Sequence, residues 1–214
     1  MPKEPHIAVI GSGTVEGTPD RCTLHAALNV MADSAAGAVT GCSEVVSKAL
    51  AALQDGGVEP SDVRTTNLSV QDFFDQAQQR VTARVATYRL EVIIRRLDDV
   101  GKVLADLTAA AGDSFQVRSF NLSVGDTEPL MSEARRLAVH DAQRKAAELA
   151  EAAGVELGAI LSLRDPAIYS PDLMSGGRRT PRAGSVASAA SPPLPVEPGT
   201  VMFTSSVVLV YAIA

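Results

Sequence analysis

The sequence predicts an α+β protein in which helices cover an antiparallel sheet. Segments where apolar and polar residues alternate, as in strands, are separated by segments with helical periodicity. A short internal echo supports this order, because residues 64–70 (RTTNLSV) resemble residues 118–124 (RSFNLSV). Each copy closes a strand, helix, strand segment. The middle of the chain is therefore predicted to have the β-α-β-β-α-β order of a ferredoxin-like core.

This core follows a glycine-rich first strand. Its predicted elements are a strand over 21–31, a helix ending near 54, a hairpin of strands over 63–74 and 81–95, a short helix from 98 to 112, and a strand over 115–124. Asp33 and Ser34 are suited to cap the first helix, and the Asp-Gly-Gly sequence at 55–57 stops it. The two helices are expected to cover one face of the sheet.

A long third helix and further strands are predicted after this core. The helix opens at Thr127 and Pro129 and ends at Gly154. Its predicted apolar stripe consists of Ala134, Leu137, Ala138, Ala142, Ala146, Leu149 and Ala153. Strands over 155–163 and 201–213 then complete the fold.

The last predicted strand is apolar on both faces. One face carries Phe203, Val207, Leu209 and Tyr211, and the other carries Met202, Val208 and Val210. Such a strand needs cover on both sides, either at the centre of a sheet or at a subunit interface. We therefore take the first face as a candidate oligomer interface and expect a homo-oligomer.

Residues 1–214 are predicted to form a single domain with a flexible insertion. At about 170–199 the composition changes to Pro, Ser, Gly and Ala. The candidate partner-docking residues of this insertion are Arg178, Arg179, Arg182, Pro192, Pro193 and Pro195. A polyproline helix is already extended before it binds, so one hypothesis is an adaptor that docks a protein partner here.

The composition argues against several classes of partner. A formal net charge of -6, from 19 basic and 25 acidic residues, offers no positive surface for nucleic acid or anionic lipid. No run reaches about 18 apolar residues, so no membrane-spanning helix is expected. The first residues lack the pattern of a secretory leader. The chain as given is therefore predicted to be cytoplasmic, or exported if a leader was removed.

The sequence contains no recognisable catalytic constellation. Residues 7–17 (IAVIGSGTVEG) resemble the start of a dinucleotide fingerprint, but Glu16 stands where the third glycine is required. The three histidines, His6, His25 and His140, are scattered without metal-ligand spacing. We therefore expect no enzyme, no metal and no cofactor. A small-molecule binder or enzyme remains an alternative, with a pocket between sheet and helices lined by Tyr88, Phe120 and Tyr211.

The two cysteines are predicted to be reduced and buried. Cys22 and Cys42 are too few for a disulfide framework and lack the spacing of a zinc site. Each lies on the apolar face of its predicted element, and free cysteine is among the most buried residue types. A disulfide between them is the alternative.

Five stretches together resemble the SIMPL-domain family, also called domain of unknown function 541. They are IAVIGSGTVEGTPD, SDVRTTNLSVQ, YRLEVIIRRLDDVGKVLADL, ARRLAVHDAQRKAAELAEAAGVELGAILSL and SSVVLVYAI. The resemblance spans nearly the whole chain. It implies an α+β fold, ring-like oligomers in some bacterial relatives, and loose links to stress responses or signalling-kinase partners. It implies no catalytic residues. We therefore expect a non-enzymatic, self-assembling structural or interaction protein with a stress-related role.

Overall fold

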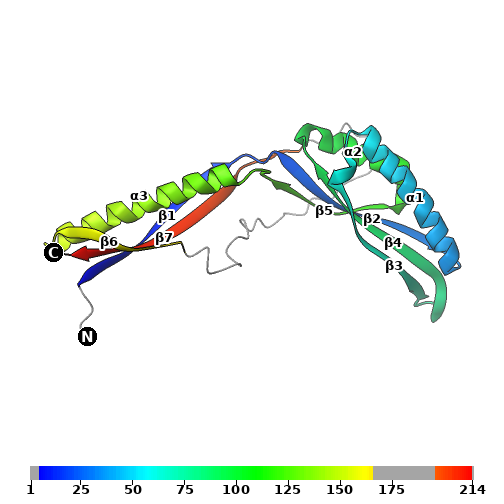
Figure 1. Ribbon diagram of the computed structural model, residues 1–214. Helices are drawn as coiled ribbons and strands as arrows, with labels where there is room; N and C mark the ends of the chain where they lie inside the picture. The colour runs from blue at the N-terminus through cyan, green and yellow to red at the C-terminus, as the bar shows by residue number, and fades with distance from the viewer. Residues whose placement is uncertain (1–4, 166–195, 214) are drawn as a thin grey trace. The chain divides into compact units, whose positions relative to one another are not determined.

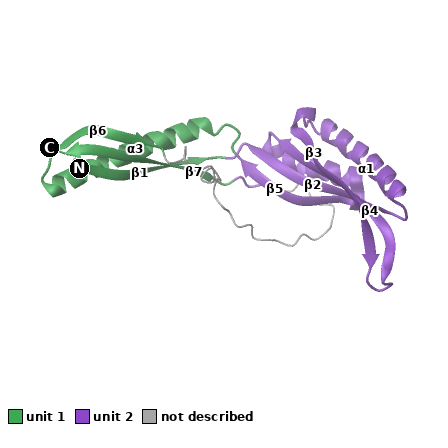
Figure 2. Cartoon of the chain, turned by 60° about the horizontal axis from the view of Figure 1, so that its bottom comes forward, with its two compact units in different colours: residues 1–18, 124–184, 199–214 green, residues 19–123, 185–198 purple. Residues whose placement is uncertain are grey.

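The computed structural model describes residues 5–165 and 196–213 (Figure 1). By their internal contacts these residues form two compact units (Figure 2). Of the described residues, unit 1 combines 5–18, 124–165 and 199–213, and unit 2 combines 19–123 and 196–198. Three helices and antiparallel strands confirm the predicted α+β class. That residues 1–214 behave as a single domain stays a prediction.

Unit 2 has the predicted ferredoxin-like arrangement. Its elements are β2 (Arg21–Ala32), α1 (Ala35–Asp55), η1 (Pro60–Asp62), β3 (Val63–Asp75), β4 (Arg80–Ile94), η2 (Leu97–Asp99), α2 (Val100–Ala111), η3 (Gly112–Ser114) and β5 (Phe115–Ser123). The strand order is β3-β4-β2-β5, and all neighbours are antiparallel. The two echo segments of the sequence therefore lie in β3 and β5, the two edge strands. Ser34 caps α1 as predicted, since its side chain accepts a hydrogen bond from the Gly37 amide.

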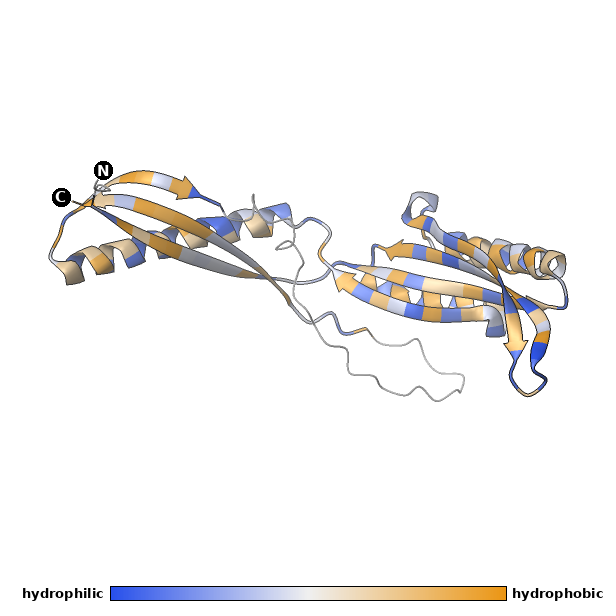
Figure 3. Ribbon diagram, turned by 90° about the horizontal axis from the view of Figure 1, so that it is seen from below, coloured by the Kyte–Doolittle hydropathy of each residue, from blue (hydrophilic) through white to orange (hydrophobic). Residues whose placement is uncertain are grey.

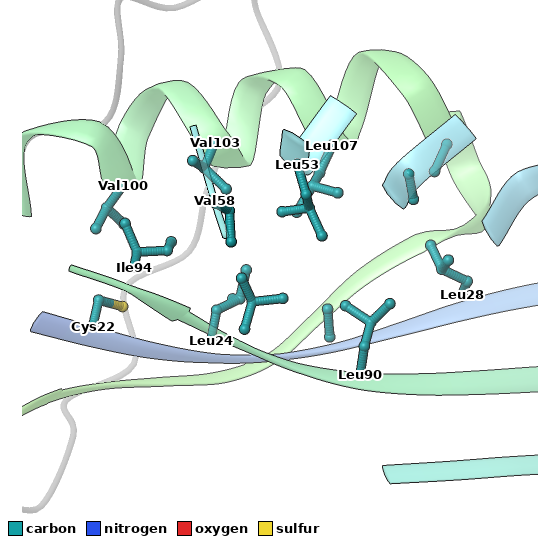
Figure 4. Close-up of a cluster of buried hydrophobic side chains, with 14 residues drawn as sticks. Cys22, Leu24, Leu28, Leu53, Val58, Leu90, Ile94, Val100, Val103 and Leu107 are labelled. Atoms are coloured by element: carbon teal, nitrogen blue, oxygen red, sulfur yellow. The ribbon is translucent and has the colours of Figure 1, made fainter. Parts of the chain in front are cut away.

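The core of unit 2 lies between its sheet and its two helices. Leu24 and Leu90 project from the central strands toward Leu53 on α1 and toward Val103 and Leu107 on α2 (Figure 4). All five side chains are almost completely buried. Burying a leucine or valine is worth about 1.5–3 kcal/mol, so this layer is the main source of stability in unit 2.

Both cysteines are free thiols inside unit 2, as predicted. Cys22 packs in the main core, and Cys42 packs in a smaller cluster on α1. Burial raises the pKa of the Cys22 thiol to about 11. Because the thiolate is the reactive form, Cys22 is inert in the folded protein.

Asp62 is a buried carboxylate that holds η1 to the end of β4. Arg95 donates two hydrogen bonds to it, from Nε to Oδ2 at 2.6 Å and from Nη2 to Oδ1 at 2.8 Å. Asp62 is 5% exposed. The hydrogen bonds from Arg95 lower the pKa of Asp62 below its ordinary value of 3.8.

We expect Asp62→Asn to lower the urea midpoint most strongly at neutral pH. Since the folded-state pKa lies below the unfolded one, the ionised carboxylate stabilises the fold above pH 3.8, and this contribution is lost as the pH falls through the folded-state value. Urea titrations at several pH values check this. Asp106→Asn, which removes an exposed ion pair with Lys102, is the matched control with a small expected effect. A deficit in Asp62→Asn that does not change with pH contradicts this account.

Unit 1 contains the first strand, the long helix and the last two strands. These elements are β1 (His6–Gly17), α3 (Glu128–Ala153), β6 (Leu157–Arg164) and β7 (Val201–Ile213). The three strands form a separate antiparallel sheet of order β1-β7-β6. Helix α3 runs along one side of β1 and β7, as Figure 1 shows. The terminal strands, far apart in sequence, are therefore neighbours over their whole length.

The glycines of β1 allow α3 to approach the strand very closely. A Cβ atom on Gly11 would clash with the carbonyl oxygen of Ala138 and lie 2.5 Å from the amide nitrogen of Ala142. A Cβ atom on Gly13 would clash with the carbonyl oxygen of Ala134 in the same way. The glycine-rich segment that resembled a nucleotide fingerprint therefore packs against a helix. Glycine is needed here because no side chain fits.

This close approach also narrows the buried stripe of α3. The buried residues are Ala134, Ala138, Ala142, Ala146 and Ala150, spaced by four. The predicted stripe is wrong at Leu149, which is 50% exposed, and at Ala153, which is exposed too. Only a methyl group fits between the helix and the strand backbone, so the larger side chain lies outside the contact.

Candidate interaction surface

Among the described residues of unit 1, only one face of the sheet is covered by a helix. On β7, Val207, Leu209 and Tyr211 point toward α3 and are 3%, 0% and 6% exposed. Val208 and Val210 alternate with them and point to the opposite face, where they are half-buried. Within unit 1, α3 is the one described helix, so no described helix of this unit lies over that second face.

The bare face is apolar toward the end that carries the chain termini. Ile10 is paired with Val208, and Ala8 is paired with Val210. The side chain of Ile10 is 64% exposed. Ser12, paired with Ser206, begins a polar stretch farther along the same strands. Figure 3 shows the strongly apolar ends of these strands near the two termini. We call Ala8, Ile10, Val208 and Val210 the bare patch.

The structure places the predicted interface residues in the core instead of on this face. Val207, Leu209 and Tyr211 belong to the buried cluster under α3. Phe203 is half-buried, and its ring would lie 3.0 Å from a Cβ atom on Gly17. Their role as an oligomer interface stays a prediction. The other face of the same strand, also noted as apolar in the sequence, is the one that remains uncovered within unit 1.

The outer edge of β1 is closed by two side chains from α3. The Ser12 amide donates a hydrogen bond to Asp141 Oδ2 at 2.9 Å, and Lys145 Nζ donates one to the Ile10 carbonyl oxygen at 3.0 Å. Lys145 and Asp141 also form an ion pair at 2.7 Å. The hydrogen bonds from Lys145 and Ser12 hold the pKa of Asp141 far below its ordinary value. Strand addition needs free backbone groups, so this edge is blocked at its centre.

The other edge strand, β6, has no such backbone contacts from side chains of the described residues. Ile160, Leu161 and Leu163 are 49%, 51% and 56% exposed. Two register shifts against β7, on either side of Ile160, interrupt the strict alternation of the strand. Apolar side chains therefore emerge along β6 without cover from α3, which packs mainly on β1 and β7.

The three residues expected to line a pocket between sheet and helices do not belong to one unit, and that pocket stays a prediction. Tyr211 lies in unit 1, whereas Tyr88 and Phe120 lie in unit 2, where Tyr88 bonds to Thr65 and Phe120 is 47% exposed. Shallow surface hollows lie elsewhere on the described residues. One lies along α1 near Ser43, and another lies between β1 and α3.

No group of three or more His, Cys, Asp or Glu residues among residues 5–165 and 196–213 is arranged to bind a metal ion. Of the histidines predicted to be scattered, His25 lies 3.8 Å from Glu91, and Glu91 also pairs with Arg64 at 3.0 Å. None of the helices in this part of the chain is long and apolar enough to cross a membrane. The docking residues predicted at 178–195 lie outside the described residues.

The hydrogen bonds that Asp141 and Lys145 form with the backbone of β1 could not be predicted from the sequence. An acidic residue followed four positions later by a lysine signals an ion pair on one helix face. It does not indicate that both groups also bond the backbone of a strand 129 or 135 residues away.

Together the fold and its surfaces define a class of α+β protein, with a ferredoxin-like unit and a three-stranded sheet backed by one helix. The sequence profile of the SIMPL family, described as a protein of unknown function (DUF541), matches residues 7–211. The chain belongs to the SIMPL family, as the resemblance implied.

Curated relatives agree with this assignment. The 26 kDa periplasmic immunogenic protein of Brucella melitensis biotype 1 is 30% identical, and the match covers 97% of this chain and 84% of that protein. The uncharacterized protein YggE of Escherichia coli K12 is 30% identical over 77% of this chain and 67% of its own length. The uncharacterized protein YggE of Edwardsiella ictaluri is 29% identical, and the match covers 77% of this chain and 69% of that protein.

Proposed function

We propose that this chain is a self-assembling structural or interaction protein that associates through unit 1. The observation that carries the proposal is the bare patch on the central strand of its sheet. Val208 and Val210 lie on β7, between two neighbouring strands, with Ile10 64% exposed beside them. When a second surface covers the apolar face of such a sheet and removes it from water, the free energy falls, so association is favoured.

The family and its relatives bear on the same proposal. The SIMPL family, to which the chain belongs, is described as a protein of unknown function. The Brucella relative is named as periplasmic, which supports a place of action outside the cytoplasm. A stress-related role stays a prediction from the family resemblance.

We expect the purified protein to have the mass of a discrete multimer in light scattering during size-exclusion chromatography, and Val210→Asp to shift that mass toward the protomer. A carboxylate at this position would have to be desolvated in the assembly. Thr204→Asp introduces the same charge on the same face of β7, outside the bare patch, and should leave the mass unchanged. Circular dichroism checks that both variants fold.

A wild-type protein that is monomeric at every concentration contradicts the proposal. Equal loss of assembly in Val210→Asp and Thr204→Asp also contradicts it, because the bare patch would then have no special part in association.

A further inference from the structure

The two edges of the unit 1 sheet differ in a way that decides where a further strand can add. The β1 edge has its central backbone groups occupied by Asp141 and Lys145. The β6 edge, at the other side of the sheet, carries exposed Ile160, Leu161 and Leu163 and contains no proline or lysine. Proteins usually protect edge strands with such residues or with a covering element. The β6 edge is therefore the open one.

The charged residues at the two ends of β6 have no ion-pair partner among the described residues. Glu156 directly precedes the strand and Arg164 ends it. Neither residue forms an ion pair or a side-chain hydrogen bond with any residue that the structure describes, whereas most charged residues of the neighbouring helix α3 are paired. One acidic and one basic end make the strand complementary to an antiparallel copy of itself.

We infer that β6 pairs antiparallel with β6 of a second copy of this chain, so that two three-stranded sheets become one continuous sheet. The inference rests on the proposed self-assembly and adds to the bare-patch contact a second contact, at the β6 edge, with a defined register. A two-fold axis at Ile160 places that residue opposite its own copy. It places Leu157 opposite Leu163 of the partner subunit, and Glu156 opposite Arg164 of the partner subunit.

This register provides partners for the exposed apolar side chains, the terminal charges and the edge backbone groups of β6. The exposed apolar side chains meet apolar side chains, and both terminal charges meet an opposite charge. The free backbone groups of the edge gain partners from an identical strand, as in strand addition generally. Because the β1 edge is blocked, pairing stops at two copies along this direction and forms a closed two-fold contact rather than a growing ribbon.

The register can be tested by disulfide crosslinking of full-length Ile160→Cys with copper phenanthroline as the oxidant. Opposed residues of antiparallel strands have Cβ atoms about 5 Å apart, close to the separation that a disulfide requires. The matched control is Leu149→Cys on α3, since the two native side chains are 49% and 50% exposed. The native thiols, Cys22 and Cys42, are buried and do not compete.

We expect Ile160→Cys to form covalent dimers at least about tenfold faster than Leu149→Cys, because pairing holds the two thiols together. Equal rates for the two variants overturn the inference. Light scattering separates this failure from failure of the proposed function. A multimer without preferred crosslinking at Ile160 removes the β6 contact alone, whereas a monomer removes both.

A charge exchange provides an independent test that adds no thiol. Glu156→Arg or Arg164→Glu alone places like charges opposite each other at two symmetric positions, so we expect dimer dissociation constants to rise about tenfold. The double variant Glu156→Arg with Arg164→Glu restores opposite charges and should restore affinity. Failure of the double variant to recover affinity overturns the register, since both single changes lie on exposed positions and leave the core intact.

Discussion

Gly11→Ala is expected to lower the free energy of unfolding of unit 1 by about 3 kcal/mol or more. The added methyl group would clash with the Ala138 carbonyl oxygen and lie 2.7 Å from the Ala142 Cβ atom. Both obstacles belong to the helix backbone or to the smallest side chain, so neither can rotate away. The helix must shift, and its alanine contacts to β1 are then lost along several turns.

Ser12→Thr is the matched control for this prediction. It also adds one methyl group to β1, but Ser12 is exposed on the opposite face, and its backbone hydrogen bond to Asp141 stays available. We expect a change within about 0.5 kcal/mol, since a β-branched residue suits a strand. Urea unfolding followed by circular dichroism compares the two variants. Equal midpoints would mean that α3 does not pack on β1 at this separation.

Leu209→Ala is expected to lower the free energy of unfolding by about 2–5 kcal/mol, the usual range for removing a buried leucine side chain. Leu209 is 0% exposed and packs in the cluster beneath Ala138, Ala142 and Ala146 of α3. The vacated space cannot collapse easily, because α3 already lies against the backbone of the neighbouring strand β1 at Gly11 and Gly13 and cannot move closer to the sheet.

Val208→Ala is the control, since it shortens the next residue of β7 on the uncovered face. It should cost much less stability, because Val208 is only half-buried. The pair also tests the interface expected at Leu209 from the sequence. If Leu209→Ala dissociates the assembly without lowering the unfolding midpoint, Leu209 is an interface residue and the core assignment is wrong.

The strand and helix order of unit 2 could be predicted because each element carries its own local signal. Alternation in β2 and the cap at Ser34 are properties of a few neighbouring residues. The echo between β3 and β5 then indicated the duplicated order. The bare face of β7 was predictable in part, since Val208 and Val210 alternate with Leu209 in the sequence. Which of the two faces would receive the helix was not.

Which face of β7 is covered could not be predicted, because the covering helix α3 lies far from β7 in the sequence. The helix α3 selects the face of β7 that continues the glycines of β1, because only there can alanine and glycine backbones approach closely. The same contact puts Asp141 within reach of Ser12 and so closes the β1 edge, whereas β6 forms the opposite edge of the sheet. By itself the sequence determined the α+β class, the ferredoxin-like order and the two-sided apolar strand. The buried face and the protected edge required the folded structure, because both depend on contacts between distant segments: α3 with β7, and Asp141 with the Ser12 amide 129 positions away.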